Sequence, residues 1–183
     1  TVDLGKNSIE IHKSKAEPWK ITLVDTGMNT MTGGRIKRVM DYVGNKSFML
    51  TYGDGVSNIN IKALVEFHWK AQKLATVTAV QPSGRFGAIA LSEEFTVRSF
   101  TEKPAADGSW INGGFFVLEP GIFDYLKDDD ATVWERSPLE SLARDNQLAA
   151  FKHTGFWRPM DTLRDRIELD NMWNTGKAEW KIW

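Results

Sequence analysis

The sequence predicts an α/β fold with a mixed sheet, and three observations carry that prediction. The pattern of residues 47–80 predicts a short apolar strand, an amphipathic helix and a β-branched strand. This is the order of a βαβ unit in a parallel sheet. The length of 183 residues corresponds to roughly one domain. Hydrophobic residues make up 42% of the chain and charged residues 26%, so there is enough apolar material for a core.

The remaining elements follow from residue type and periodicity. Alternating or β-rich stretches predict strands at 8–12 and 19–24. Apolar residues at helical spacing predict one helix after the Gly33-Gly34 turn and another around 61–68. Further strands are expected near 86–92, 96–102, 113–118 and 148–153, and helices near 134–145 and 162–174.

Composition excludes several classes of protein. The chain has 23 basic and 24 acidic side chains, which argues against a charge-driven nucleic-acid binder and against a polybasic membrane patch. No apolar run approaches the ~18 residues of a membrane span. The absence of cysteine excludes a disulfide scaffold and thiol catalysis, and it is compatible with the reducing cytoplasm, where we expect the protein. Eight tryptophans indicate large aromatic contacts, including contacts between subunits.

Two aspartates are candidates for metal binding. Asp54 lies between two glycines directly after an apolar strand, and ligands of open α/β sheets bind beyond the carboxyl ends of strands. Asp161 precedes the last predicted helix. Two carboxylates from separate strand ends suit one Mg²⁺ that bridges nucleotide phosphates. The alternatives are an ordinary turn at Asp54 and a helix N-cap at Asp161.

Three further motifs are candidates for phosphate, sugar and base contacts. Glu102-Lys103-Pro104 ends a strand and offers a fixed positive charge to a phosphate, unless it is a solvated strand end. Asn112-Gly113-Gly114 offers an amide to sugar hydroxyls, unless it is a turn entering a strand. The glycines before Arg35 could expose helix N–H groups to a base or phosphate.

Other polar residues are expected to be structural. The three histidines lack metal-ligand spacing, and His68 lies on the apolar face of its helix, where packing is the expected role. The acidic run at 127–130 lacks the spacing of a calcium loop and is expected to be a solvated loop.

Taken in order, eight segments resemble the glucose-1-phosphate cytidylyltransferases, which are sugar-phosphate nucleotidylyltransferases. The segments are EPW (17–19), TLVDTG (22–27), MTGGRIKR (31–38), TYGDG (51–55), GRFGA (84–88), SFTEKP (99–104), INGGFFVL (111–118) and GFWRPMDTLRD (155–165). The resemblance implies a Rossmann-like mixed, mostly parallel sheet of the nucleotidyltransferase type. It also implies Mg²⁺-dependent formation of CDP-glucose and pyrophosphate from CTP and glucose 1-phosphate, in surface-polysaccharide (O-antigen) synthesis, by a cytoplasmic homo-oligomer.

The resemblance also implies roles for individual residues. Asp54 and Asp161 match the magnesium-binding aspartates, and together with Arg35 and Lys103 they form the expected catalytic set. The positions that match nucleotide contacts are Thr30, Arg35, Gly53 and Asp54. The positions that match sugar-phosphate contacts are Glu102, Lys103, Asn112 and Gly113.

One departure from the family is large. The family opens with a first strand and a Gly-rich loop ending in Gly-Thr-Arg, and nothing in residues 1–183 matches them. We therefore expect residues 1–183 to be the C-terminal three quarters of an N-terminally incomplete nucleotidyltransferase domain, inactive by itself. The alternatives are a non-catalytic nucleotide-sugar binding module, an inactive fragment, or a relative that uses UTP or dTTP.

Overall fold

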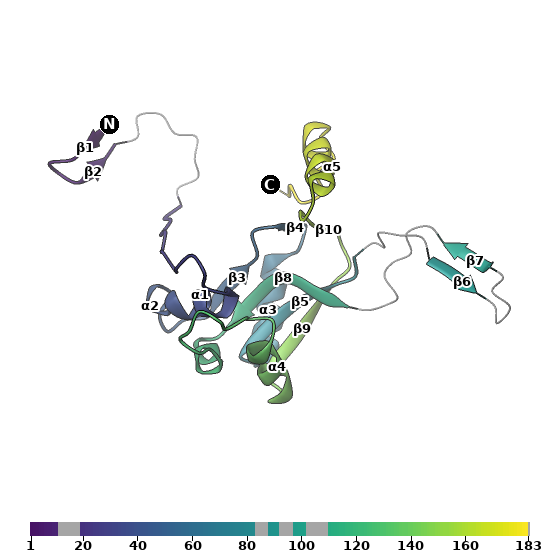
Figure 1. The fold of residues 1–183 in the computed structure, drawn as a ribbon, viewed down its shortest axis with the longest axis horizontal. Helices are drawn as coiled ribbons and strands as arrows, with labels where there is room; N and C mark the ends of the chain where they lie inside the picture. Colours follow the sequence, from purple (N-terminus) through teal and green to yellow (C-terminus); the bar gives the residue numbers. More distant parts are fainter. Residues whose placement is uncertain (11–18, 83–87, 92–96, 102–109, 183) are drawn as a thin grey trace.

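A four-stranded mixed sheet forms the centre of the computed structural model (Figure 1), which describes residues 1–10, 19–82, 88–91, 97–101 and 110–182. The strand order is β3 (Phe48–Thr51), β8 (Ile111–Leu118), β5 (Ala75–Val80) and β9 (Leu148–His153). β8 is antiparallel to both of its neighbours, whereas β5 and β9 are parallel. Three strands therefore share one direction, and β8 runs against them.

The predicted strand–helix–strand unit is present, with one difference. β3 and β5 point the same way and are joined through α3 (Ile61–Ala71), as expected. They are not neighbours, because β8 pairs with both of them. Local periodicity predicts strand direction well, but it carries no information about a later strand that inserts between two earlier ones.

Helices cover both faces of the sheet. On one face, α3 contributes Leu64 to a small buried cluster with Val117 of β8. On the other face lies the larger core, formed with α1 (Thr32–Arg38), the 3₁₀ helix η1 (Pro120–Tyr125) and α4 (Ser137–Arg144). Phe116 belongs to this larger core and Val117 to the smaller cluster, as the alternation of side chains along a strand requires. Trp134 is fully buried and packs edge-on against Phe116.

The remaining elements lie around the central sheet and the helices that cover it. β4 (Gly55–Ser57) and β10 (Trp157–Pro159) form a two-stranded antiparallel sheet that leads into α5 (Leu163–Asn174). A hairpin of β1 (Val2–Asp3) and β2 (Ser8–Ile9), and a pair of β6 (Ala88–Leu91) and β7 (Val97–Thr101), lie outside the central sheet (Figure 1). The short α2 (Met40–Val43) follows α1.

One predicted strand is wrong. Within the described residues, 19–30 contain no strand, and Trp19, Ile21 and Leu23 are 75%, 71% and 92% exposed. β-branched and aromatic residues stabilise a strand only where a neighbouring strand and a packed face are available, and the described part of the chain offers this segment neither. The strand expected at 8–12 is limited to Ser8–Ile9, and residues 11–12 lie outside the described residues.

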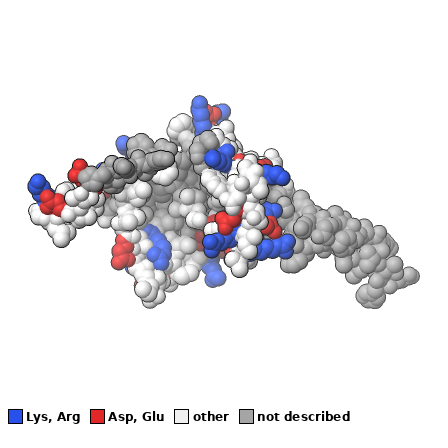
Figure 2. All heavy atoms as spheres, turned by 90° about the horizontal axis from the view of Figure 1, so that it is seen from above, with Lys and Arg blue, Asp and Glu red and all other residues white. Residues whose placement is uncertain are grey.

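The hydrophobicity of the helices and the distribution of surface charge both bear on the class of protein. No helix among the described residues is long and apolar enough to cross a membrane. Figure 2 shows basic and acidic side chains interspersed over the visible face, in agreement with the formal net charge of −1.

Candidate functional site

Most candidate residues gather at one end of the central sheet. The pairing of Val80 with Ile111 and with His153 places the carboxyl ends of β5 and β9 beside the start of β8. The carboxyl end of β3 lies at the same end, because Thr51 pairs with Phe115. Ligands of open α/β sheets bind at this end, so the topology brings the predicted residues to the expected place.

The β4–β10 pairing brings the two predicted metal ligands to the same end of one small sheet. Gly55 pairs with Pro159, and the Met160 N–H donates to the Asp54 carbonyl oxygen at 2.6 Å. Asp54 and Asp161 are therefore near neighbours in the backbone although they are far apart in the sequence. Both residues are exposed.

The capping alternative for Asp161 is wrong. Thr162 is the N-cap of α5: its hydroxyl accepts from the Asp165 N–H at 3.2 Å, and the Asp165 carboxylate accepts from the Thr162 N–H at 3.0 Å. This reciprocal pair is a capping box. The N-cap of α5 is therefore Thr162 and not Asp161.

The carboxylates of Asp54 and Asp161 fit a magnesium ion, which takes most of its ligands from phosphate and water, better than a metal ion whose ligands all come from the protein. Among the described residues there is no group of three or more His, Cys, Asp or Glu side chains that could hold a metal ion. Mg²⁺ commonly takes one or two carboxylates and completes its octahedron with phosphate and water oxygens. The two exposed carboxylates of Asp54 and Asp161 match that requirement.

Gly113 and Gly114 lie in a bulge inside β8 directly after Asn112, so this motif is not a turn that precedes the strand. The register with β5 shifts between Val77 and Ala79, which pair with Phe116 and Asn112. Gly114 has φ +78°, a conformation that favours glycine, and a Cβ at Gly113 would lie 2.9 Å from a methyl group of Val80. Bulges re-aim side chains next to binding sites, and this one fixes the direction of the Asn112 amide.

Gly53 is the one candidate whose glycine the fold does not require. A Cβ at Gly53 would meet nothing within 4 Å, and Gly53 is not among the glycines with positive φ. The space beside Asp54 is therefore open, which is what a bound nucleotide would need.

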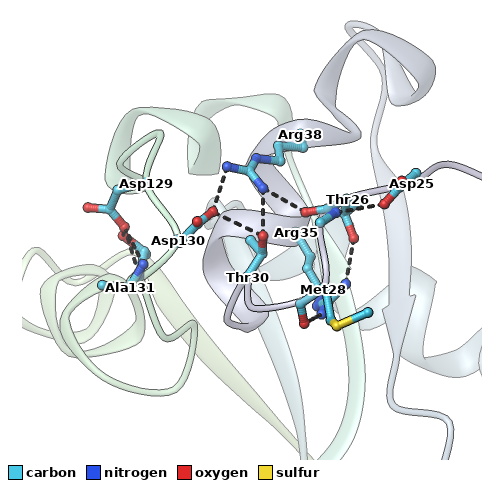
Figure 3. A network of polar contacts seen from close by, with 11 residues as sticks. Asp25, Thr26, Met28, Thr30, Arg35, Arg38, Asp129, Asp130 and Ala131 are labelled. Atoms are coloured by element: carbon cyan, nitrogen blue, oxygen red, sulfur yellow. Dashed lines mark hydrogen bonds and ion pairs between the residues drawn. The ribbon is translucent and has the colours of Figure 1, made fainter.

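Arg35 of α1 and Thr30 just before it, both expected to contact the nucleotide, have partners within the protein (Figure 3). Arg35 donates to the Thr26 hydroxyl at 2.7 Å and to the Met28 carbonyl oxygen at 3.2 Å. The Thr30 hydroxyl is buried and donates to Asp130 at 3.0 Å. These contacts shape the loop at 25–31, and Arg35 remains exposed.

Arg38 and Asp130 are central to this loop and were not predicted. Arg38 donates to the Thr26 carbonyl oxygen at 2.7 Å, to the Thr30 hydroxyl at 2.5 Å and to Asp130 at 2.7 Å (Figure 3). The segment 127–130 is an exposed loop, as expected, and Asp130 in addition ties it to α1. Asp129 also has a defined role, since one of its oxygens accepts from the hydroxyl and the N–H of Thr132, and these bonds lower the pKa of Asp129.

The N–H groups that open α1 are already occupied. Gly33 and Gly34 donate to the Thr132 carbonyl oxygen at 2.9 and 3.2 Å. The expectation that these glycines present N–H groups to a base or phosphate is therefore wrong. They are glycines because the turn at 129–132 packs directly against them.

The other sequence interpretations have clear outcomes. His68 is buried, with one ring nitrogen 2.8 Å from the Thr76 hydroxyl and the other 3.0 Å from Glu119, so its packing role is confirmed. Glu102 and Lys103 lie outside the described residues.

Comparison with known proteins shows the class of protein to which this α/β fold belongs. Residues 8–171 match the nucleotidyl transferase family. A crystal structure of a putative glucose-1-phosphate thymidylyltransferase from Bacillus anthracis aligns with TM-score 0.56 and 18% identity, over 81% of this chain and 61% of that one. That likeness shows the shared fold.

Relatives with higher sequence identity indicate the subfamily within this family. The glucose-1-phosphate cytidylyltransferase of Salmonella typhi is 53% identical over the whole chain, and a probable glucose-1-phosphate cytidylyltransferase of Bacillus subtilis is 43% identical. The chain belongs to the glucose-1-phosphate cytidylyltransferases within the nucleotidyl transferase family. It spans 71% of the length of both of these relatives.

Proposed function

We propose that this protein transfers a cytidylyl group from CTP to α-D-glucose 1-phosphate and releases pyrophosphate. One structural observation supports the reaction class above all: the β4–β10 pairing brings Asp54 and Asp161 to the same end of the sheet as the Asn112 bulge. The identity of the base and sugar is supported by the relatives, which are named for glucose 1-phosphate and the cytidylyl group.

The proposed chemistry needs no covalent intermediate. A phosphate oxygen of glucose 1-phosphate attacks the α-phosphorus of CTP, and a new P–O bond forms as the bond to the β-phosphate bridge breaks. Pyrophosphate leaves with the electron pair. The attacking phosphate is already ionised near neutral pH, so no general base is required, and the protein contributes positioning and charge neutralisation.

Each candidate residue has one role in this proposal. Asp54 and Asp161 would hold Mg²⁺, which supplies positive charge to the phosphate oxygens. Arg35 and Lys103 add positive charge near the nucleotide and the sugar phosphate. Gly53 contacts the nucleotide, and Thr30, which is buried and bonded to Asp130 and Arg38, acts through the shape of the loop at 25–31. Glu102, Asn112 and Gly113 contact the sugar, and the amide of Asn112 offers it both a donor and an acceptor.

We further propose that the protein is a homo-oligomer of the cytoplasm that serves surface-polysaccharide synthesis. A contact between two copies through α5 is supported by its exposed apolar side chains, since Leu163 and Ile167 lie four residues apart and are 70% and 51% exposed. The charged variant Ile167→Glu should lower the oligomeric mass measured by light scattering. An unchanged mass would exclude this helix from the interface.

The proposed reaction is tested by pyrophosphate release from CTP, glucose 1-phosphate and Mg²⁺ in the full-length protein. Asp161→Asn should lower turnover by at least about a hundredfold, the scale of losing one electrostatic stabiliser. Asp170→Asn is the matched control, because Asp170 is an exposed carboxylate of α5 paired with Arg166 at 3.6 Å, away from the sheet end. Near-normal turnover by Asp161→Asn would remove Asp161 from the mechanism.

The same assay separates the alternatives. A preference for UTP or dTTP over CTP would assign the protein to another base specificity. Binding of a nucleotide sugar without pyrophosphate release would identify a non-catalytic binding module.

A further inference from the structure

A chain of side-chain hydrogen bonds links α1 to the sugar-binding bulge. The Asn112 amide nitrogen donates to the Tyr52 hydroxyl at 3.2 Å, and the Tyr52 hydroxyl is hydrogen-bonded to one carboxylate oxygen of Glu135. The other Glu135 oxygen accepts from the Thr32 hydroxyl at 2.8 Å. The Thr32 oxygen in turn accepts from the Trp134 N–H at 2.9 Å. Four segments distant in sequence therefore share one network.

An accepting carboxylate at Glu135 sets the direction of the bonds that lead to Asn112. An ionised carboxylate only accepts, so the Tyr52 hydroxyl must donate its proton to Glu135 and offer a lone pair to Asn112. The Asn112 amide must then present its NH₂ group to Tyr52.

The other end of the Asn112 amide is fixed as well. Its carbonyl oxygen accepts from the Gly114 N–H at 2.8 Å, inside the bulge. An asparagine amide has two donor hydrogens and two acceptor lone pairs. Tyr52 and Gly114 use one of each, so one donor and one acceptor remain, and Asn112 is exposed to receive a ligand. The remaining pair matches a sugar hydroxyl, which both donates and accepts.

Tyr52 also packs against the bulge itself. A Cβ at Gly114 would lie 2.9 Å from the Tyr52 ring, so the ring occupies the space that a side chain at this position would need. The Tyr52 N–H donates to the Gly114 carbonyl oxygen at 3.0 Å. The ring therefore supports the bulge while the hydroxyl orients Asn112.

We infer that Tyr52 and Glu135 are positioning residues that orient the Asn112 amide for the hydroxyls of the sugar, an inference that rests on the proposed function. They act through Asn112 and do not themselves contact the substrate. The network sets how tightly the sugar is bound and leaves nucleotide binding unchanged.

The test compares equilibrium binding of CDP-glucose and CDP to the full-length protein by titration calorimetry. Tyr52→Phe removes the hydroxyl and keeps the ring. It should weaken CDP-glucose binding about three- to tenfold, the effect of one net hydrogen bond, and change CDP binding less than about twofold. Glu135→Ala should act in the same direction, because it removes the carboxylate that accepts from the Tyr52 hydroxyl.

Tyr125→Phe is the matched control. Tyr125 also donates to a carboxylate, that of Asp145, at 3.1 Å, but it lies on η1 outside the network. This variant should leave the affinity for both ligands unchanged. A drop in CDP-glucose affinity equal to that of Tyr52→Phe would show a general effect of tyrosine removal and overturn the inference.

A double-mutant cycle separates positioning from a merely structural role. If Tyr52 acts through Asn112, then Tyr52→Phe should have almost no further effect on CDP-glucose affinity in an Asn112→Ala background. Additive effects, or equal weakening of CDP and CDP-glucose, would overturn the inference. Binding does not require turnover, so absence of pyrophosphate release by the wild type would refute the proposed function while these titrations still decide the role of Tyr52.

Discussion

Gly34→Ala tests whether the turn at 129–132 positions the start of α1. Gly34 is buried in α1, and a Cβ there would lie 2.3 Å from the Asp129 carbonyl oxygen and 2.7 Å from the Thr30 methyl group. Ordinary van der Waals contact begins at 3.4 Å, so the backbone at Asp129 would have to retreat by about 1 Å.

Two effects of opposite sign decide the outcome. Alanine in place of a helical glycine stabilises by about 1 kcal/mol. Overpacking against a backbone carbonyl costs about 1–3 kcal/mol. Retreat of the turn also weakens the hydrogen bonds from Gly33 and Gly34 to the Thr132 carbonyl oxygen, at about 0.5–1.5 kcal/mol for each. We therefore expect Gly34→Ala to lower the free energy of unfolding by about 1–5 kcal/mol, the upper end applying if both hydrogen bonds are lost.

Urea unfolding followed by tryptophan fluorescence measures this change. Gly53→Ala is the control for stability, since a Cβ at Gly53 meets nothing within 4 Å. It should shift the free energy of unfolding by less than about 0.5 kcal/mol. A Gly34→Ala protein as stable as the wild type would show that the turn does not hold α1 in place, and the packing argument would fail.

Three other predictions concern the site and the pH dependence of stability. Gly53→Ala should raise the KM for CTP in steady-state assays, because its Cβ enters the open space beside Asp54; an unchanged KM would place the nucleotide elsewhere. Lys103→Ala should raise the KM for glucose 1-phosphate and spare that for CTP, and an unchanged sugar-phosphate KM would exclude this role. Hydrogen bonds from Arg164 and Arg158 lower the pKa of Glu168 below its ordinary 4.5, so the stability that Glu168 contributes is complete above pH 4.5 and is lost as pH falls through the lowered pKa. Glu168→Gln should flatten the dependence of Tm on pH below 4.5, and identical slopes would contradict this.

The sequence predicted the site best where a motif follows a strand. Gly53-Asp54-Gly55 was placed at a strand end from local pattern alone, and the structure puts it at the carboxyl end of β3. Asp161 was ambiguous in sequence because an aspartate before a helix usually caps it. Only the capping box of Thr162 and Asp165 resolves that ambiguity.

The sequence predicted least where a role depends on a distant partner. Glu135 belongs to no motif and Tyr52 was noted only as part of TYGDG, and their connection exists only because the end of β3 and the segment before α4 meet in space. Asp130 was one of four charged residues in a run, and its pairing with Arg38 depends on how that loop packs against α1. The apolar run at 19–24 has the composition of a strand, yet strand formation requires a partner that composition does not supply.

The sequence alone determined the kinds of element, the α/β class and the family, because helix and strand periodicity, turn residues and motifs are local properties of the chain. The tertiary structure alone decided that β8 lies between β3 and β5, that β10 pairs with β4, and which way the Asn112 amide points. Those features arise from hydrogen bonds and packing between segments far apart in sequence, whose free energy depends on all of the segments at once.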